Sequence, residues 1–160
     1  MLKTIFASAA VIMTTIGFAA AHDYSAGKLK IVHPMAFETA KSAKAGAGYM
    51  AITNDSDKAD RLVEVRAEFP RVEIHNIEEK DGIASMIHME EGLDIPANKT
   101  TKLSPGGFHV MFMGLDGGLE LGTEFPATLV FENAGEVEVV FKVEERTGDE
   151  GAHDHSNHNH

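Results

Sequence analysis

Two residue types that bind soft metal ions, histidine and methionine, recur at strand spacing in this chain. Between Phe108 and Met113, alternation with period two puts apolar side chains on one face of a strand and His109 and Met111 on the other. Side chains two residues apart on a strand project about 6–7 Å apart. His109 and Met111 are therefore able to reach one metal ion together.

A second pair of donors lies upstream. His75 alternates with Val72 and Ile74, so its side chain is expected to point away from their apolar face. Met86 follows beyond a turn expected at Asp81-Gly82. A hairpin with this turn would bring Met86 back toward His75.

His75, Met86, His109 and Met111 form a soft, neutral set of two imidazoles and two thioethers. Such a set suits Cu(I), whereas Ca²⁺ and Mg²⁺ require oxygen ligands. The chain contains no cysteine, so this site has no thiolate to oxidise to a disulfide in an oxidising compartment. No nucleophile, phosphate-binding glycine loop or paired acid and base stands at diagnostic spacing. We therefore expect a copper-binding protein that is not an enzyme.

The other histidines and methionines of this region fit structural roles, because methionine fills cores and histidine is common on strand surfaces. We expect Met50, Met89, Met113 and His88 to pack rather than bind, and His33 to be a surface residue at a strand end. Two alternatives to the copper hypothesis stay open. One is an enzyme that uses copper for redox chemistry, and the other is an adhesion-type β-sandwich that binds no metal.

The beginning of the chain is typical of a cleavable signal peptide. One positive residue, Lys3, precedes the uncharged stretch Ile5–Ala21, which ends in small residues with alanine at positions 19 and 21. We expect a signal peptide over residues 1–21, export to the periplasm, and a mature terminus at His22. No membrane insertion is expected after cleavage.

The end of the chain offers a different kind of metal site. Residues 147–160 are polar and histidine-rich, which predicts a disordered tail. Imidazoles without thioethers favour Cu(II), Ni(II) or Zn(II). The α-amine and imidazole of His22 would also chelate Cu(II). An alternative function is therefore the buffering of zinc, nickel or copper, mainly through the tail histidines His153, His155, His158 and His160.

Between the two ends, residues 22–146 predict a single all-β domain. A chain of 160 residues accommodates about one domain. Its 25 Asp and Glu against 14 Lys and Arg give a net charge of -11, which disfavours binding to nucleic acid. We expect a monomeric sandwich or barrel, because short alternating runs are separated by Gly, Asn, Asp and Pro. The expected strands are Lys28–Val32, Gly48–Thr53, Arg61–Val65, Arg71–Glu78, Ser85–Met89, Thr100–Leu103, Phe108–Leu115, Ala127–Glu132 and Glu136–Glu144.

The four donors, with segments 48–54, 104–111 and 122–139, resemble the periplasmic copper chaperone family PCuAC. The resemblance spans roughly residues 28–144. It implies a cupredoxin-like Greek-key β-fold, Cu(I) bound by His75, Met86, His109 and Met111, and delivery of copper to an acceptor protein. The implied acceptor is a cytochrome c oxidase subunit or its assembly factor. The family pattern has about twenty-one residues before His-x-Met, whereas twenty-two stand here, which leaves Met89 as an alternative to Met86.

Overall fold

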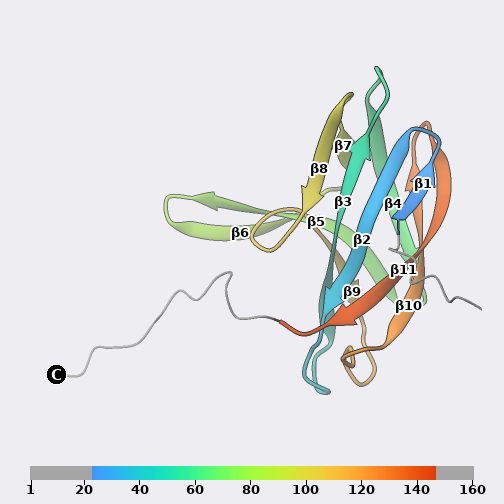
Figure 1. Ribbon diagram of the computed structural model, residues 1–160. Coiled ribbons are helices and arrows are strands. Elements are labelled where there is room, and N and C mark those ends of the chain that lie inside the picture. Colours follow the sequence, from blue (N-terminus) through green and yellow to red (C-terminus); the bar gives the residue numbers. More distant parts are fainter. Residues whose placement is uncertain (1–22, 147–160) are drawn as a thin grey trace, which may run out of the picture.

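The computed structural model describes residues 23–146, which contain eleven strands and no helix (Figure 1). The strands alternate buried and exposed side chains over much of their length, as expected for a sheet that packs one face on a core. They are β1 (Asp23–Ala26), β2 (Leu29–Phe37), β3 (Ala45–Asn54), β4 (Asp60–Ala67), β5 (Arg71–Lys80), β6 (Ile83–His88), β7 (Leu93–Ile95), β8 (Lys99–Leu103), β9 (His109–Met113), β10 (Glu124–Phe131) and β11 (Gly135–Glu144).

The strands form one sheet that wraps around the core in the order β6-β5-β9-β3-β2-β11-β10-β4-β7. The short strand β1 pairs with β2, and β8 pairs with β3. Strand β3 has two successive partners on one side, because its first half pairs with β9 and its second half with β8. All pairs are antiparallel except β11 with β2. The expectation of an all-β, cupredoxin-like fold is confirmed.

Aromatic side chains fill the core beneath β9. Phe112 is fully buried and its ring lies 5.2 Å from Phe69, 5.0 Å from Phe125 and 5.3 Å from Phe141, measured between centroids. A Cβ at Gly48 would meet the rings of Phe112 and Phe141 at 2.7 and 2.8 Å, so β3 crosses this cluster with a glycine. The apolar face of β9 is thus fixed, and the opposite face carries His109.

All nine expected strands are present, with two additions. Strands β1 and β7 were not expected because four and three residues are too short to show a period. Strand β3 begins before Gly48, at small residues such as Gly46, where a Cβ would come within 2.6 Å of Leu119. Strand β9 ends at Met113 rather than Leu115, because Gly114 adopts a positive φ of 81°.

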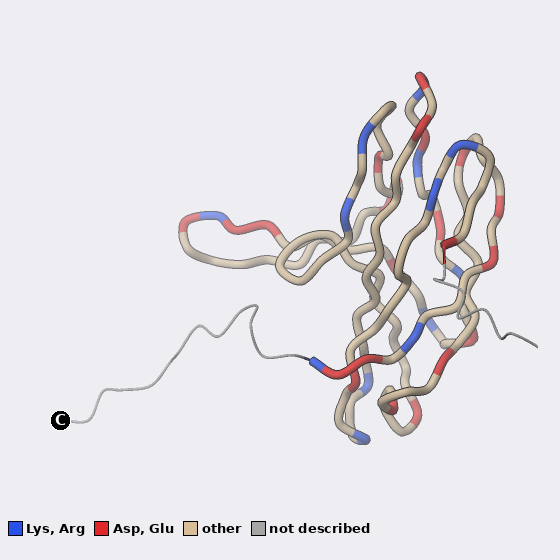
Figure 2. Tube along the Cα trace, in the orientation of Figure 1, with Lys and Arg blue, Asp and Glu red and all other residues tan. Residues whose placement is uncertain are grey.

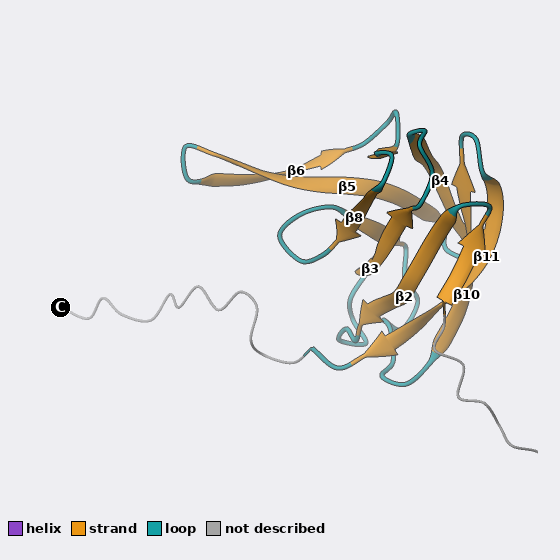
Figure 3. Ribbon diagram, turned by 45° about the horizontal axis from the view of Figure 1, so that its top comes forward, coloured by secondary structure: helices purple, strands orange, loops and turns teal. Residues whose placement is uncertain are grey.

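The β5–β6 hairpin extends away from the rest of the sheet (Figures 1 and 3). Its two turn residues, Asp81 and Gly82, have φ values of 54° and 77°, as a two-residue hairpin requires, and the turn expected there is confirmed. Acidic and basic residues gather at the tip, whereas β6 carries neither (Figure 2). All six residues of β6 are exposed.

The expected signal peptide over 1–21, the terminus at His22 and the histidine-rich tail at 147–160 lie outside the described residues. Within residues 23–146, no helix has the length and apolar character needed to cross a membrane.

Candidate metal site

Three histidines lie in a row across neighbouring strands. His75 on β5 pairs with His88 on β6 and with His109 on β9. Directly paired residues of antiparallel strands project to the same face. The ring centroid of His75 lies 5.4 Å from that of His88 and 5.8 Å from that of His109. The sheet register thus gathers three imidazoles, which we call the histidine row, on one face.

The two expected thioethers lie on this face too, on opposite sides of the histidine row. Met111 on β9 pairs with Glu73, and Met86 on β6 pairs with Ile77. Glu73 and Ile77 are the residues two before and two after His75 on β5. The backbones of Met86 and Met111 are therefore separated by two strand spacings and four residues, on the order of 15 Å. Met111 lies on the side of the histidine row toward the body of the sheet, and Met86 lies on the side toward the tip of the hairpin.

His75 has one nitrogen bonded and one without a partner. Its Nε2 lies 2.7 Å from the carboxylate Oε2 of Glu73. A carboxylate only accepts hydrogen bonds, so Nε2 carries the proton and Nδ1 of the neutral ring carries a lone pair. Nδ1 is buried, and it has no hydrogen-bond partner among the described residues. The side chain therefore presents a desolvated lone pair that a metal ion would bind.

His109 has the same arrangement with the two nitrogens exchanged. Its Nδ1 donates a hydrogen bond to the carbonyl oxygen of Gly107 at 2.9 Å, which leaves the lone pair on Nε2. The residue is 3% exposed, and the ring of Tyr49 lies 6.5 Å from its ring. Metal-binding histidines commonly donate their second nitrogen to a carboxylate or a backbone carbonyl. His75 and His109 show one example of each.

The hydrogen bond from His75 lowers the pKa of Glu73 below its ordinary value. Partial desolvation would raise that pKa, and the charge of Arg71 acts with the hydrogen bond to lower it. Arg71 lies 3.4 Å from Glu73 and also donates to the sulfur of Met113 at 3.1 Å. An ionised Glu73 holds the proton on Nε2 of His75.

The remaining methionines differ in their surroundings, and one expected packing residue is exposed. Met50 is buried in the core, Met89 is half-buried against it, and Met113 accepts the hydrogen bond from Arg71. His88, by contrast, is exposed on the face of His75. Sequence reasoning missed the positions of His88 and Glu73. The sequence did contain one indication of them. Glu73 is two residues from His75 and His88 is two residues from Met86, so each shares a strand face with an expected ligand.

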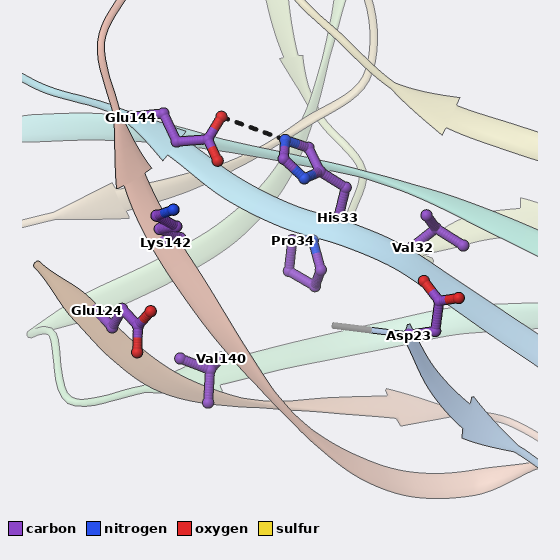
Figure 4. A pocket seen from close by; sticks show the side chains of 8 residues that line it. All are labelled: Asp23, Val32, His33, Pro34, Glu124, Val140, Lys142 and Glu144. Carbon is purple, nitrogen blue, oxygen red and sulfur yellow. Dashed lines mark ion pairs between the residues drawn. The ribbon is translucent and has the colours of Figure 1, made fainter. Parts of the chain in front are cut away.

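His33 lies apart from the histidine row. It was expected at a strand end, but it lies within β2, where the pairing with β3 shifts register and φ of His33 is 54°. Its Nε2 lies 3.2 Å from Glu144, and both residues line a separate pocket (Figure 4). In residues 23–146, no group of three or more His, Cys, Asp or Glu is arranged to hold a metal ion. A site on the histidine row therefore needs thioether donors or a side-chain movement.

Comparison with known proteins places this chain in a family. A family model named LpqE-like and described as "Putative lipoprotein LpqE-like" matches residues 29–143. The chain belongs to the LpqE-like family. A curated relative, "Putative lipoprotein Lxx21020" of Leifsonia xyli subsp. xyli (strain CTCB07), is 35% identical over 77 residues. That match spans 48% of this chain and 46% of the relative, so it covers less than half of each.

Solved structures of PCuAC domains share the fold of this LpqE-like chain. The apo PCuAC domain from PmoF1 is 32% identical, with a TM-score of 0.65, over 78% of this chain and 99% of that chain. The copper-bound PCuAC domain from PmoF2 is 30% identical, with a TM-score of 0.64, over 78% of this chain and 98% of that chain. The solution structure of CuI-DR1885 from Deinococcus radiodurans is 28% identical, with a TM-score of 0.59, over 71% of this chain and 76% of that chain. The resemblance to PCuAC proteins is thus confirmed for the domain.

Proposed function

We propose that this LpqE-like protein is an exported copper carrier, which binds Cu(I) on the face shared by β5, β6 and β9 and passes it to an acceptor protein. One observation carries the proposal. Two buried imidazoles, His75 and His109, each have one nitrogen held by a hydrogen-bond acceptor and the other left with a lone pair, and thioethers flank them. Neutral nitrogen and sulfur donors suit Cu(I).

The structural relatives support copper as the ion, because one of them is a copper-bound PCuAC domain and another is a Cu(I) form. The proposed ligands are His75, Met86, His109 and Met111. Met89 stays an alternative to Met86 from the sequence spacing, but its side chain packs against the core.

Transfer follows from the unequal exposure of the donors. His75 and His109 are 9% and 3% exposed, whereas Met86 on the projecting hairpin is 51% exposed. His75, His109 and Met111 form the fixed part of the site, and Met86 is the ligand that arrives last and leaves first. An acceptor ligand enters on the hairpin side as Met86 leaves, so the ion never has to be released into water.

The acceptor and the compartment follow from the PCuAC resemblance and the sequence. We propose export through the signal peptide to the periplasm and delivery toward cytochrome c oxidase assembly. The histidines of the tail capture Cu(II) and raise the metal concentration near the domain. The lipoprotein names of the family and of the curated relative support export of this protein.

X-ray absorption on Cu(I)-loaded protein that lacks residues 151–160 tests the site. We expect two nitrogen neighbours at about 2.0 Å and two sulfur neighbours at about 2.3 Å, by analogy with the distances known for zinc. A spectrum with no sulfur neighbour would contradict the ligand set. Competition between Cu(I) and Zn(II) for the same protein separates the carrier from a zinc or nickel buffer, because a buffer that works through the tail loses its metal with the deletion.

A further inference from the structure

We infer that His88 is a metal ligand, and that the histidine row binds Cu(II) through His75, His88 and His109. This inference rests on the proposed function, because it adds a second binding mode to the proposed Cu(I) site. It assigns to the folded domain a Cu(II) site that is separate from the histidines of the tail.

The spacing of the three rings fits coordination of one ion. With metal–nitrogen bonds of about 2.0 Å, the centroids of two imidazoles on the same ion lie about 4.4 to 6 Å apart, depending on the angle at the metal. The centroid distances of 5.4 Å and 5.8 Å from His75 to its two neighbours fall in this range. Each neighbouring pair of the row is thus spaced as two ligands of one ion, and the outer rings, His88 and His109, must both turn toward His75 for all three to bind it.

Each ring has a nitrogen to offer. Nδ1 of His75 is buried and unpartnered among the described residues, and Nε2 of His109 is left by the bond to Gly107. The side chain of His88 is exposed, and no hydrogen bond or ion pair ties it to the rest of residues 23–146. Its ring already lies beside the row, with its centroid 5.4 Å from that of His75.

Strand β6 presents two donors of different character to the same pair of buried imidazoles. Met86 and His88 are two residues apart and share a face. A thioether suits the soft ion Cu(I), whereas a third imidazole suits Cu(II), which favours nitrogen donors in a tetragonal arrangement. Glu73, hydrogen-bonded to His75, supplies a nearby negative charge for the divalent ion. The oxidation state of the bound ion therefore selects which residue of β6 binds it.

Pulsed electron paramagnetic resonance counts the imidazoles bound to Cu(II). The parent protein is the full chain with glutamine in place of His22, His153, His155, His158 and His160, which removes the other expected Cu(II) ligands. We expect one Cu(II) with three imidazoles. His88→Gln should reduce the count to two and weaken Cu(II) binding at least about tenfold, since even partners outside the ligand set contribute that much. Cu(I) affinity should change less than about twofold.

His33→Gln is the matched control, because His33 is an exposed histidine away from the row. It should leave the imidazole count and the Cu(II) affinity unchanged, and both variants should keep the parent's thermal unfolding midpoint. An unchanged imidazole count in His88→Gln overturns the inference, and so does a parent that binds Cu(I) but no Cu(II). If the unsubstituted chain binds no Cu(I), the proposed function is wrong. Failure of the Cu(II) inference and failure of the proposed function therefore give different results.

Discussion

Two buried polar clusters of this domain differ in how completely their polar atoms are hydrogen-bonded. At the end of β3, next to the loop that leads to β4, the fully buried Asn54 donates from Nδ2 to the carbonyls of Lys58 and Ile95 at 2.8 and 3.1 Å. Its Oδ1 accepts from the backbone N–H and the hydroxyl of Ser56. Every polar atom of the Asn54 side chain has a partner, whereas Nδ1 of His75 has none among the described residues.

Asp60, at the start of β4, completes the satisfied cluster. Its carboxylate accepts hydrogen bonds from the backbone N–H groups of Arg61, Asn133 and Ala134. Buried polar groups in native proteins nearly always have partners, so an unpaired one calls for an explanation. The loop cluster has the pattern of polar groups that hold a fold together. The histidine row has the pattern of a site that keeps a lone pair for a ligand.

The largest effect is expected on metal binding. His75→Gln removes the buried lone pair at the centre of the row, and we expect the Cu(I) affinity to fall at least about a hundredfold, or about 2.7 kcal/mol. Glutamine keeps an N–H group that can donate to Glu73, and Nδ1 of His75 has no hydrogen-bond partner among the described residues, so the free energy of unfolding should change little. Competition with a Cu(I) chelator and urea denaturation measure the two quantities. A strongly destabilised variant with unchanged Cu(I) affinity would make His75 a structural residue.

Asn54→Ala should have the reverse profile. The substitution removes the Asn54 donor to the carbonyl of Ile95 and the Asn54 acceptor of the Ser56 N–H, whereas the carbonyl of Lys58 keeps the Ser56 hydroxyl as a donor. Each buried polar group left unsatisfied costs about 1–3 kcal/mol. We expect a loss of about 2 kcal/mol or more in the free energy of unfolding, measured by urea denaturation, with the Cu(I) affinity of the folded protein unchanged. Thr53→Ala, one residue before on the same strand, removes only an exposed hydroxyl pair and is the control. If the two variants lost the same free energy of unfolding, the buried hydrogen bonds of Asn54 would contribute no more stability than the exposed hydroxyl pair.

Asp60→Asn tests the same cluster through pH. Burial alone would raise the pKa of Asp60, but the donors from Asn133, Arg61 and Ala134 outweigh it and hold the pKa below its ordinary value. A lowered folded pKa means that the stabilisation is present above the unfolded pKa of about 3.9 and is lost as the pH falls through the folded pKa. The stability difference between wild type and Asp60→Asn should be constant near neutral pH and shrink below about pH 4. A difference that grew toward low pH would contradict this assignment.

The sequence was sufficient to predict the faces of single strands and the hairpin turn. Alternation placed His109 and Met111 opposite the apolar face of β9, and Asp81-Gly82 predicted the turn, because both depend on neighbouring residues only. The four expected ligands do lie on one face, which is a necessary condition for the predicted site. Whether they bind metal stays a prediction.

The register between strands was beyond reach of the sequence. That His75 lies opposite both His88 and His109 depends on β5 pairing with β9, and such pairing is decided by the packing of the whole sheet. The roles of Glu73 and His88 follow only from that register. An acidic residue and an exposed histidine on strands carry no mark of function until their neighbours across the sheet are known.

The smallest effect separates the two thioethers. Leucine is nearly isosteric with methionine, so Met111→Leu and Met86→Leu remove a sulfur donor at little cost to folding. We expect Met111→Leu to lower the Cu(I) affinity about tenfold, or about 1.4 kcal/mol, because its backbone is fixed in the body of the sheet. Met86→Leu should cost less at equilibrium, since part of its binding energy is spent on ordering an exposed side chain. Met86→Leu should mainly change the rate at which Cu(I) is transferred to a chelator, which stopped-flow mixing measures. If Met86→Leu lowered the affinity more than Met111→Leu, the hairpin and not the body of the sheet would hold the ion.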